Sequence, residues 1–502
     1  MNTQNSPQDV IIIGAGVSGI GLACTLSRES PDKRYLVLEQ RDDLGGTWDL
    51  FRYPGIRSDS DMFTFSYDFK PWTRPNLLAD GPSIKQYVSE AASENGVTAH
   101  IRFGRKVIRA DWSSELALWT LTVSDNKTGE SERYQTRFVF FCTGYYRYEA
   151  GYRPHFPGEE KFAGQIVQPQ HWPEDLDYSG KRVVIIGSGA TAITLVPSMA
   201  DKAGHVTMLQ RSPGYILSVP AIDRVAEQVQ RWLPERVAYR LTRSRNILLH
   251  RSLYQICKSR PQAMRRLLLA QVRHQLKGKV DMRHFTPNYM PWDQRLCVVP
   301  NGDLFKVLRE GRASIVTDHI DTFTTDGIRL KSGELIQADL IVAATGLDVN
   351  LLGGMTIHVD GEAVNLGERM LYQSVLIEGV PNAGLLFGYI NVSWTLRVNI
   401  VSSYICRLLR HMDKHHLKTV LPVDDALQAE TGSFVGGLSA GYIQRASEHL
   451  PRQGRSGPWR AWHDYLRDLP ALKFAPVAGK ELVFDVAPPE YLRSLDTEIT
   501  AQ

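Results

Sequence analysis

The feature that most constrains this chain is a glycine-rich turn that occurs twice, each time between an apolar strand and a helix. The first turn follows the β-branched run 10–13 and carries Gly14, Gly16 and Gly19. The second follows the similar run 183–186 and carries Gly187, Gly189 and Ala192. In nucleotide-binding units of the Rossmann type, such residues permit a tight turn and let the helix N-terminus approach a pyrophosphate. We therefore expect an α/β chain with two dinucleotide sites.

The residue that follows the second strand of each unit predicts which nucleotide the unit binds. In the first unit the strand 35–38 ends at Glu39, whose carboxylate would accept hydrogen bonds from ribose hydroxyls and repel a 2′-phosphate. In the second unit the strand 206–209 is followed by Gln210, then Arg211 and Ser212. A guanidinium binds phosphate through two hydrogen bonds, so the second site favours NADP(H) and the first favours NAD or FAD. The alternative for Arg211 is an ordinary solvated arginine.

An FAD site and an NADPH site on one chain predict transfer of a hydride from nicotinamide to flavin. The cysteines exclude the disulfide reductases, because the five of them lie far apart and form no CxxC pair. Their spacing also argues against a zinc site, so no metal is expected, and it indicates a reducing, cytoplasmic location. The net charge is only +4, which gives no reason to expect a nucleic-acid partner.

Between Arg224 and Arg283 the chain is strongly basic, with fifteen Lys or Arg residues against three Asp or Glu. Its pattern is helical and is interrupted by Pro234 and Pro261, which predicts an all-helical insertion. Three interpretations stay open. The block is a solvated helical surface with its apolar residues turned inward, its charge attracts the anionic NADPH, or its Arg and Leu clusters make a peripheral contact with a membrane of anionic lipid.

Two longer motifs identify a family. Residues 45–59 match all seven specified positions of the pattern (A/G)GxWxxxx(F/Y)P(G/M)xxxD. Residues 162–173 match FxGxxxHxxxW(P/D) at Phe162, Gly164, Trp172 and Pro173, but have Gln168 at the histidine position. Through these motifs the chain resembles the type I Baeyer–Villiger monooxygenases, which are class B flavoprotein monooxygenases. Through segments such as 49–62, 291–305 and 388–396, it is also similar to the ethionamide-activating bacterial members of that group.

The resemblance implies five segments and two sets of cofactor contacts. The FAD-binding domain is expected in residues 1–147 and 348–502, the NADPH-binding domain in 148–215 and 294–347, and the helical insertion in 216–293. The expected FAD contacts are Gly14, Gly16, Gly19, Glu39, Gly46, Thr47, Trp48 and Asp59. The expected NADPH contacts are Gly187, Gly189, Thr191, Ala192, Arg211 and Ser212.

The resemblance also implies a reaction. In this family FAD reduced by NADPH reacts with molecular oxygen to a C4a-peroxyflavin, which converts ketones to esters or lactones and oxygenates sulfides or thioamides. The family's active-site arginine corresponds to Arg295 and its partner to Asp59, while Trp394 falls near the flavin and substrate cavity or in the core. Because Gln168 replaces the histidine, the alternatives are a heteroatom (S or N) oxygenase or an uncoupled NADPH oxidase without ketone activity. A remote alternative is a pseudoenzyme that senses NADPH. The natural substrate and the oligomeric state stay open.

Overall fold

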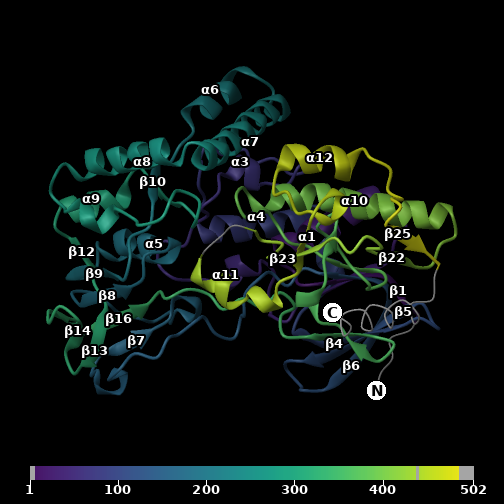
Figure 1. The fold of residues 1–502 in the computed structure, drawn as a ribbon, viewed down its shortest axis with the longest axis horizontal. Coiled ribbons are helices and arrows are strands. Elements are labelled where there is room, and N and C mark those ends of the chain that lie inside the picture. The colour runs from purple at the N-terminus through teal and green to yellow at the C-terminus, as the bar shows by residue number, and fades with distance from the viewer. Residues whose placement is uncertain (1–5, 437–439, 486–502) are drawn as a thin grey trace.

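The computed structural model describes residues 6–436 and 440–485 of the chain. Figure 1 shows two bodies side by side, each built around its own sheet. Three helices lie along the upper side of this view: α6 (Arg224–Trp232), α7 (Glu235–Ser259) and α8 (Pro261–Leu276). The first glycine turn belongs to the first body and the second turn to the second body, because the strands before the two turns lie in different sheets.

The first body is built around a mixed sheet. Its strands are β1 (Gln8–Ile13), β2 (Tyr35–Leu38), β3 (Ile101–Arg102), β4 (Arg105–Ser113), β5 (Leu118–Asp125), β6 (Ser131–Phe141), β17 (Thr356–Val359), β18 (Glu362–Ala363), β19 (Leu371–Tyr372), β20 (Leu376–Ile377) and β21 (Ala383–Leu385). β1 lies between β2 and β6 and is parallel to both. Strands after residue 355 pair with strands before residue 142, since β17 pairs with β4 and β21 with β6. The first body is therefore assembled from both ends of the chain.

The second body has a fully parallel sheet. Its strands, in spatial order, are β12 (Ala313–Thr317), β9 (His205–Gln210), β8 (Arg182–Ile186), β16 (Leu340–Ala343) and β7 (Gln165–Val167). Helices α5 (Ala190–Met199) and α9 (Asp303–Arg309) cover one face. A small antiparallel sheet of β13 (Ile320–Thr324), β14 (Gly327–Leu330) and β15 (Leu335–Gln337) covers the other. Burial on both faces explains why β8 and β16 are continuous apolar runs.

The remaining elements complete the two bodies. In the first body α1 (Val17–Glu29) and α10 (Trp394–Lys414) pack together on one face of the sheet. The other helices are α2 (Thr47–Leu50), α3 (Met62–Phe65), α4 (Gly81–Glu94), α11 (Gly441–Arg445) and α12 (Tyr465–Lys473). The other strand pairs are β10 (Ile216–Val219) with β11 (Cys297–Pro300), β22 (Val420–Pro422) with β25 (Leu482–Phe484), and β23 (Ala429–Ser433) with β24 (Arg452–Gly454). This is the α/β architecture with two Rossmann-type units and a helical insertion that the sequence predicts.

The helical insertion differs in detail from the expectation. Its helices begin at Arg224, because residues 216–219 form β10 and pair in parallel with β11. The two prolines separate the helices as expected: Pro234 precedes α7, and Pro261 occupies the first turn of α8, where its missing N–H costs no hydrogen bond. Among the described residues, none of the helices combines the length and the hydropathy that a membrane span requires.

Candidate functional site

The first glycine turn joins β1 to α1 and leaves the helix N-terminus without a side-chain cap. Gly14 has φ +105°, and a Cβ there would lie 2.6 Å from the carbonyl oxygen of Cys142. A Cβ at Gly19 would lie 1.9 Å from the carbonyl oxygen of Gly14, so only glycine lets α1 pack this closely on the turn. The N-terminus of α1, with Gly16 at the N-cap position, presents free N–H groups and a positive dipole that suit a phosphate.

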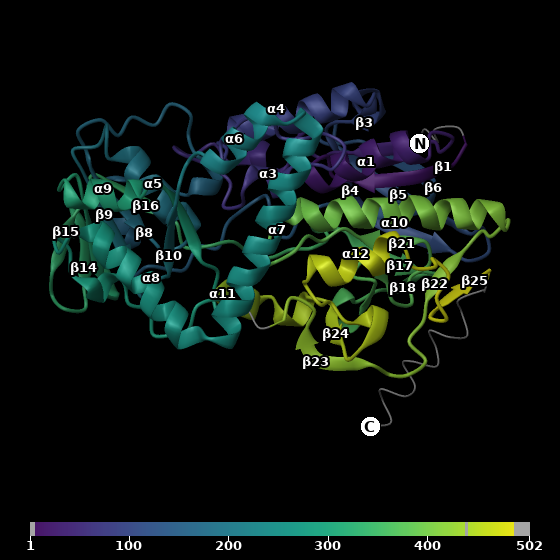
Figure 2. The same ribbon diagram turned by 90° about the horizontal axis from the view of Figure 1, so that it is seen from above.

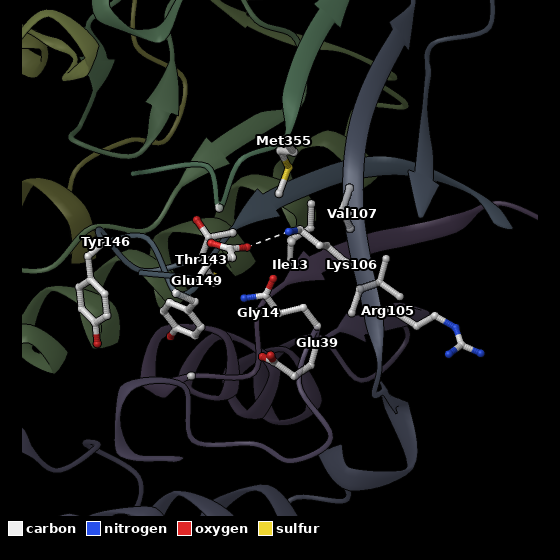
Figure 3. A pocket seen from close by; sticks show the side chains of 16 residues that line it. Ile13, Gly14, Glu39, Arg105, Lys106, Val107, Thr143, Tyr146, Glu149 and Met355 are labelled. Carbon is white, nitrogen blue, oxygen red and sulfur yellow. Dashed lines mark hydrogen bonds and ion pairs between the residues drawn. The ribbon is translucent and has the colours of Figure 1, made fainter. Parts of the chain in front are cut away.

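A pocket lies beside this turn (Figure 3). Glu39 lines the pocket and is buried. Its carboxylate accepts hydrogen bonds from the N–H groups of Ala15 (2.6 Å) and Arg41 (2.9 Å). Burial raises the pKa of Glu39, and the two N–H groups partly oppose that rise. Lys106 and Glu149, which also line the pocket, form an ion pair of 2.7 Å. The pocket thus places a carboxylate next to a phosphate-binding turn, as a nucleotide ribose requires.

The loop that carries Gly46 packs on the first glycine turn. Gly46 has φ +57°, and a Cβ there would lie 2.9 Å from the Cα atom of Gly16. Thr47 begins α2, and its hydroxyl accepts a hydrogen bond from the hydroxyl of Tyr146, another residue of the pocket. Trp48 is half-buried and packs against the core of the first body. Gly46 and Thr47 therefore lie next to the pocket, whereas Trp48 also has a packing role.

The second glycine turn repeats the geometry of the first. Gly187 has φ +144°, and a Cβ there would lie 2.3 Å from the carbonyl oxygen of Ala344, just as Gly14 approaches that of Cys142. Gly189 precedes α5, which no side chain caps, and the space beside its Cα is open. Ala192 is fully buried in α5. The second turn thus offers the same kind of anion site as the first.

Arg211 and Ser212 follow β9 and are both exposed. The preceding residue, Gln210, is buried and anchors the strand end, donating hydrogen bonds to the carbonyl oxygen of His284 (2.7 Å) and the hydroxyl of Thr317 (2.9 Å). Within residues 6–436 and 440–485, the Arg211 guanidinium has no carboxylate within 4.0 Å. It is therefore available to an external phosphate.

The first motif leaves the first body and packs on α5 of the second. Tyr53 is buried in the core of the second body, where burial raises the pKa of its hydroxyl and a hydrogen bond with Thr191 opposes the rise. Gly55 has φ +77°, and a Cβ there would lie 1.9 Å from the Oγ atom of Ser198. The motif therefore joins the two glycine turns physically. Sequence reasoning placed Thr191 with NADPH, and the structure brings it to Tyr53 as well.

Asp59, at the end of this motif, lies near Arg295, which precedes β11. Both side chains are exposed to solvent, and each feels the charges of neighbouring protein groups. Burial raises the pKa of Asp59, and the charges of Arg295 and Arg57 lower it. The surrounding protein lowers the pKa of Arg295, but the neighbouring Tyr442, Tyr145 and Asp59 outweigh this effect, so the pKa is raised overall. Arg295 therefore stays a cation.

Three residues of this cluster were missed by sequence reasoning. Tyr145 follows β6 and stacks on Trp394 with ring centroids 5.4 Å apart, and burial raises its pKa to about 12. Tyr442 comes from α11. His463 is buried, and burial together with the cations Arg397 and Arg295 lowers its pKa to about 3, so it is neutral. No local motif marks these residues because each comes from a separate segment.

The second motif lies within the second body. Phe162 is buried between the two sheets of that body, and a Cβ at Gly164 would lie 2.5 Å from the carbonyl oxygen of Asp339. Trp172 packs against the core around α5, and Pro173 is half-buried. These four residues therefore maintain the fold of the second body near the connection to the first.

Gln168, the residue that departs from the second motif, is half-buried. In the described part of the chain no hydrogen bond to its side chain is present. Gln170 is buried instead, and its amide donates to the carbonyl oxygens of Arg147 (2.6 Å) and Tyr148 (3.1 Å), in the segment that connects the bodies. His171 is exposed and contacts the carbonyl of Glu149 at 3.1 Å. Gln170 therefore holds the connecting segment, a role that sequence reasoning did not foresee.

Comparisons with known proteins agree with this geometry. Residues 7–346 match the family described as Flavin-binding monooxygenase-like. A probable FAD-binding monooxygenase, AlmA of Acinetobacter sp, is 53% identical over 93% of this chain and 94% of its own length. The FAD-containing monooxygenase EthA of Mycobacterium tuberculosis is 47% identical over 96% of this chain and 98% of its own length. An oxidized steroid monooxygenase bound to NADP shares the fold, with a TM-score of 0.75 at 19% identity over 95% of this chain and 99% of that one. The resemblance predicted from the two motifs is confirmed: the chain belongs to the flavin-binding monooxygenase-like family.

Proposed function

We propose that this chain is an FAD- and NADPH-dependent monooxygenase that converts ketones to esters or lactones and oxygenates sulfides or thioamides. The observation that carries the proposal is the placement of the cation Arg295 near Asp59, Tyr145 and Tyr442, which come from separate segments of the chain. The packing of the first motif on α5 supports it, because this contact joins the two predicted cofactor sites.

The residues present fit both cofactors. For FAD, the uncapped N-terminus of α1 would hold the pyrophosphate and Glu39 the ribose, while Gly14, Gly16 and Gly46 leave room for close backbone approach. For NADPH, the uncapped N-terminus of α5 would hold the pyrophosphate. The exposed guanidinium of Arg211, with Ser212, would bind the 2′-phosphate, which NADH lacks.

The charges in the site suit an oxygen transfer. When bound, reduced FAD supplies the electrons that activate molecular oxygen. Arg295 would stabilise the negative charge that develops on the carbonyl oxygen of a ketone under nucleophilic attack. Asp59 would orient the guanidinium. Neutral His463 and Tyr145 add polar groups without adding charge.

The overall reaction balances with molecular oxygen as the oxidant. NADPH and a proton supply the two electrons and two hydrogens that convert one oxygen atom to water, leaving NADP⁺. The other oxygen atom is inserted between the carbonyl carbon and a neighbouring carbon, or is added to a sulfur. An apolar ketone, sulfide or thioamide is therefore the expected substrate class.

The test supplies the FAD-loaded protein with NADPH and oxygen, with and without 2-octanone or methyl phenyl sulfide. NADPH consumption, oxygenated product and peroxide are quantified together. Ester formed in proportion to NADPH supports the proposal in full, and sulfoxide without ester limits it to heteroatom oxygenation. If both cofactors bind and no NADPH is consumed, the enzymatic assignment fails and an NADPH-sensing pseudoenzyme replaces it.

The second candidate, an uncoupled NADPH oxidase, rests on Gln168. Its side chain has no hydrogen-bond partner in the described residues, and unlike a histidine it cannot carry a charge. Gln168→His is the matched test. If the wild type releases mainly peroxide and the variant forms product, the oxidase assignment holds. Equal product yields from both proteins would show that Gln170 alone suffices to hold the connecting segment.

A further inference from the structure

Helix α7 turns apolar side chains toward solvent. Val237, Leu241, Leu248 and Ile256 follow one another at spacings of four, seven and eight residues, which places them along one side of the helix, and all four are exposed. Leu249 beside them is 57% exposed. The interpretation that the basic block has its apolar residues turned inward therefore holds only in part, because Ile247 and Leu268 are buried whereas these five residues face solvent.

The opposite side of α7 is buried and carries both polar and apolar residues, among them Tyr239, Ile247 and Cys257. Thr242, Arg243 and Asn246 are among its buried residues. The Arg243 guanidinium donates to the carbonyl oxygens of Phe63 (2.7 Å) and Ser66 (2.9 Å). The helix therefore binds the first body through hydrogen bonds and apolar contacts, while Val237, Leu241, Leu248, Leu249 and Ile256 stay exposed to solvent. Burial of apolar surface is favourable by about 25 cal/mol per Å², so an exposed stripe of this kind indicates a binding surface.

The stripe continues onto the neighbouring helices. Trp232, the last residue of α6, is 84% exposed, and Val225 on the same helix is also exposed. Leu267 on α8 is 62% exposed. Figure 1 shows α6 and α7 projecting from the upper side of the molecule, and Figure 2, seen from that side, shows α6, α7 and α8 along one outer face. We call these three helices the helical platform; the exposed apolar residues on them are Val225, Trp232, Val237, Leu241, Leu248, Leu249, Ile256 and Leu267.

The charge of the helical platform selects its partner. Residues 224–283 carry fifteen Lys or Arg against three Asp or Glu, and Arg236, Arg240 and Lys258 lie exposed on α7 beside the apolar side chains. A second copy of this chain would present the same positive charge, which opposes self-association through this face. Anionic lipid headgroups complement the cations, while the acyl chain region accepts the apolar side chains.

We infer that the helical platform binds the surface of an anionic lipid bilayer, with Trp232 and the leucines of α7 inserted to the level of the headgroups. The helices lie on the membrane and do not cross it. This inference concerns exposed residues that are not among the predicted cofactor contacts, so it stands or falls independently of the proposed reaction. Since the contact is partly electrostatic, it weakens as added salt screens the cations, over a Debye length of about 8 Å at physiological ionic strength.

The test is co-sedimentation of the FAD-loaded full chain with vesicles. One set contains phosphatidylcholine alone, and in the other about a third of the lipid is phosphatidylglycerol. Three proteins are compared: the wild type, a triple variant with Trp232→Ser, Leu241→Ser and Leu249→Ser, and a control with Leu116→Ser. Leu116 is 59% exposed, close to Leu249, but lies between β4 and β5, away from the helical platform.

The wild type and the Leu116→Ser control are expected to bind the anionic vesicles alike, and the triple variant at least about tenfold more weakly. Arg236→Gln with Arg240→Gln is expected to weaken binding about fivefold for each charge removed. Equal binding of the triple variant and the wild type would overturn the inference, as would equal binding to both kinds of vesicle. NADPH consumption in the absence of lipid checks that each variant is folded.

Light scattering after size exclusion tests whether a second copy of the chain, instead of lipid, covers the helical platform. A monomer, or an oligomer that the triple variant retains, agrees with a lipid-facing platform. An oligomer that the triple variant alone disrupts would assign the platform to a second copy of the chain and overturn the inference.

Discussion

Single charged residues that follow two strands underlie the cofactor preference that we propose for each glycine turn. Glu39 follows β2 and is buried beside the first turn, whereas Arg211 follows β9 and is exposed beside the second. A buried carboxylate accepts hydrogen bonds from hydroxyls and repels phosphate, and an exposed guanidinium binds phosphate. The difference between two otherwise similar turns therefore lies in one side chain each.

Arg211→Ala is expected to raise the KM for NADPH about 10- to 100-fold, because a charge-assisted hydrogen bond to the 2′-phosphate is lost. The KM for NADH should change little, since NADH has no phosphate at that position. Steady-state kinetics with both nucleotides measures the ratio. Arg329→Ala, which removes an exposed arginine from β14 of the same body, is the control for loss of charge alone. A parallel rise of KM for NADH and NADPH would contradict the assignment.

Arg295→Ala is expected to lower the rate of ester formation about 100- to 1,000-fold, since the cation that stabilises developing negative charge is removed. Reduction of FAD by NADPH depends on other residues and should fall far less. Rapid mixing without oxygen measures that reduction, and product analysis measures the oxygenation. Asp59→Asn keeps the size of the side chain and is expected to give an intermediate rate. Equal losses in reduction and oxygenation would indicate a structural role for Arg295.

At the scale of secondary-structure elements, the contact between the first motif and α5 joins the two nucleotide sites. Tyr53 is buried in the core around α5, and the backbone of Gly55 packs closely against the side chain of Ser198. The first motif, which the resemblance assigns to FAD binding, therefore also contacts the second body through Tyr53 and Gly55. Gly55 is required for two reasons: its φ is positive, and α5 approaches its Cα atom closely.

Gly55→Ala is expected to displace the loop from α5 and to lower both the affinity for NADPH and the turnover rate. Ser198→Gly removes the atoms that the new Cβ would meet. The double variant should therefore recover NADPH affinity in part, leaving the backbone strain of about 1 kcal/mol at φ +77°. Isothermal titration with NADP⁺ on the four proteins of this cycle measures the coupling. Additive losses would contradict contact between the two residues.

Strand β16 is joined to β8 by an ion pair whose strength depends on pH. The Asp339 carboxylate accepts hydrogen bonds from the Arg182 side chain (2.6 and 3.1 Å) and backbone N–H (2.8 Å), which lowers the pKa of Asp339 to about 2. A carboxyl group with a lower pKa in the folded state stabilises the fold above its unfolded pKa, about 3.9, and loses that contribution as the pH falls through the folded value.

Asp339→Asn is accordingly expected to lower the free energy of unfolding at neutral pH by no more than about 1 kcal/mol, because both partners are partly exposed to solvent. The difference from the wild type should shrink below about pH 4. Urea unfolding at a series of pH values measures it, with Asp321→Asn, at an exposed carboxylate nearby in the chain, as the control. A difference that grows as the pH falls would contradict the sign.

In the whole molecule, α7 ties the helical insertion to the first body. Figure 2 shows this helix running between the two bodies. Arg243 is buried in the contact and pairs with Asp68 at 2.6 Å in addition to its bonds with α3. A buried cation with several partners is costly to remove, because the partners are left unpaired. The same helix presents the apolar side that we assign to lipid.

Arg243→Met is expected to destabilise the holoenzyme by about 3 kcal/mol. The variant should release FAD at a lower temperature, which the rise in FAD fluorescence during heating measures. Arg240→Met removes an exposed arginine from the same helix and should change stability by less than about 0.5 kcal/mol. Similar effects of the two substitutions would show that α7 is not held to the first body through Arg243.

The sequence by itself determined the two Rossmann units and the chemistry at the ends of their strands. The strands before the two turns, the helices after them and the positions of Glu39 and Arg211 are local properties, because glycine conformation and β-branched runs act within a few residues. Arg295 and Asp59 needed the resemblance to a family, since nothing in their spacing marks a pair.

Only the tertiary structure decided which distant segments meet. Tyr145, Tyr442 and His463 join Arg295 because β6, α11 and the segment before α12 return to one place, and no local pattern encodes that return. The direction of the apolar side of α7 was likewise decided by tertiary contacts. Hydrogen bonds from Arg243 and apolar contacts of Tyr239 and Ile247 bury the other side, and a helix can bury only one side against one partner.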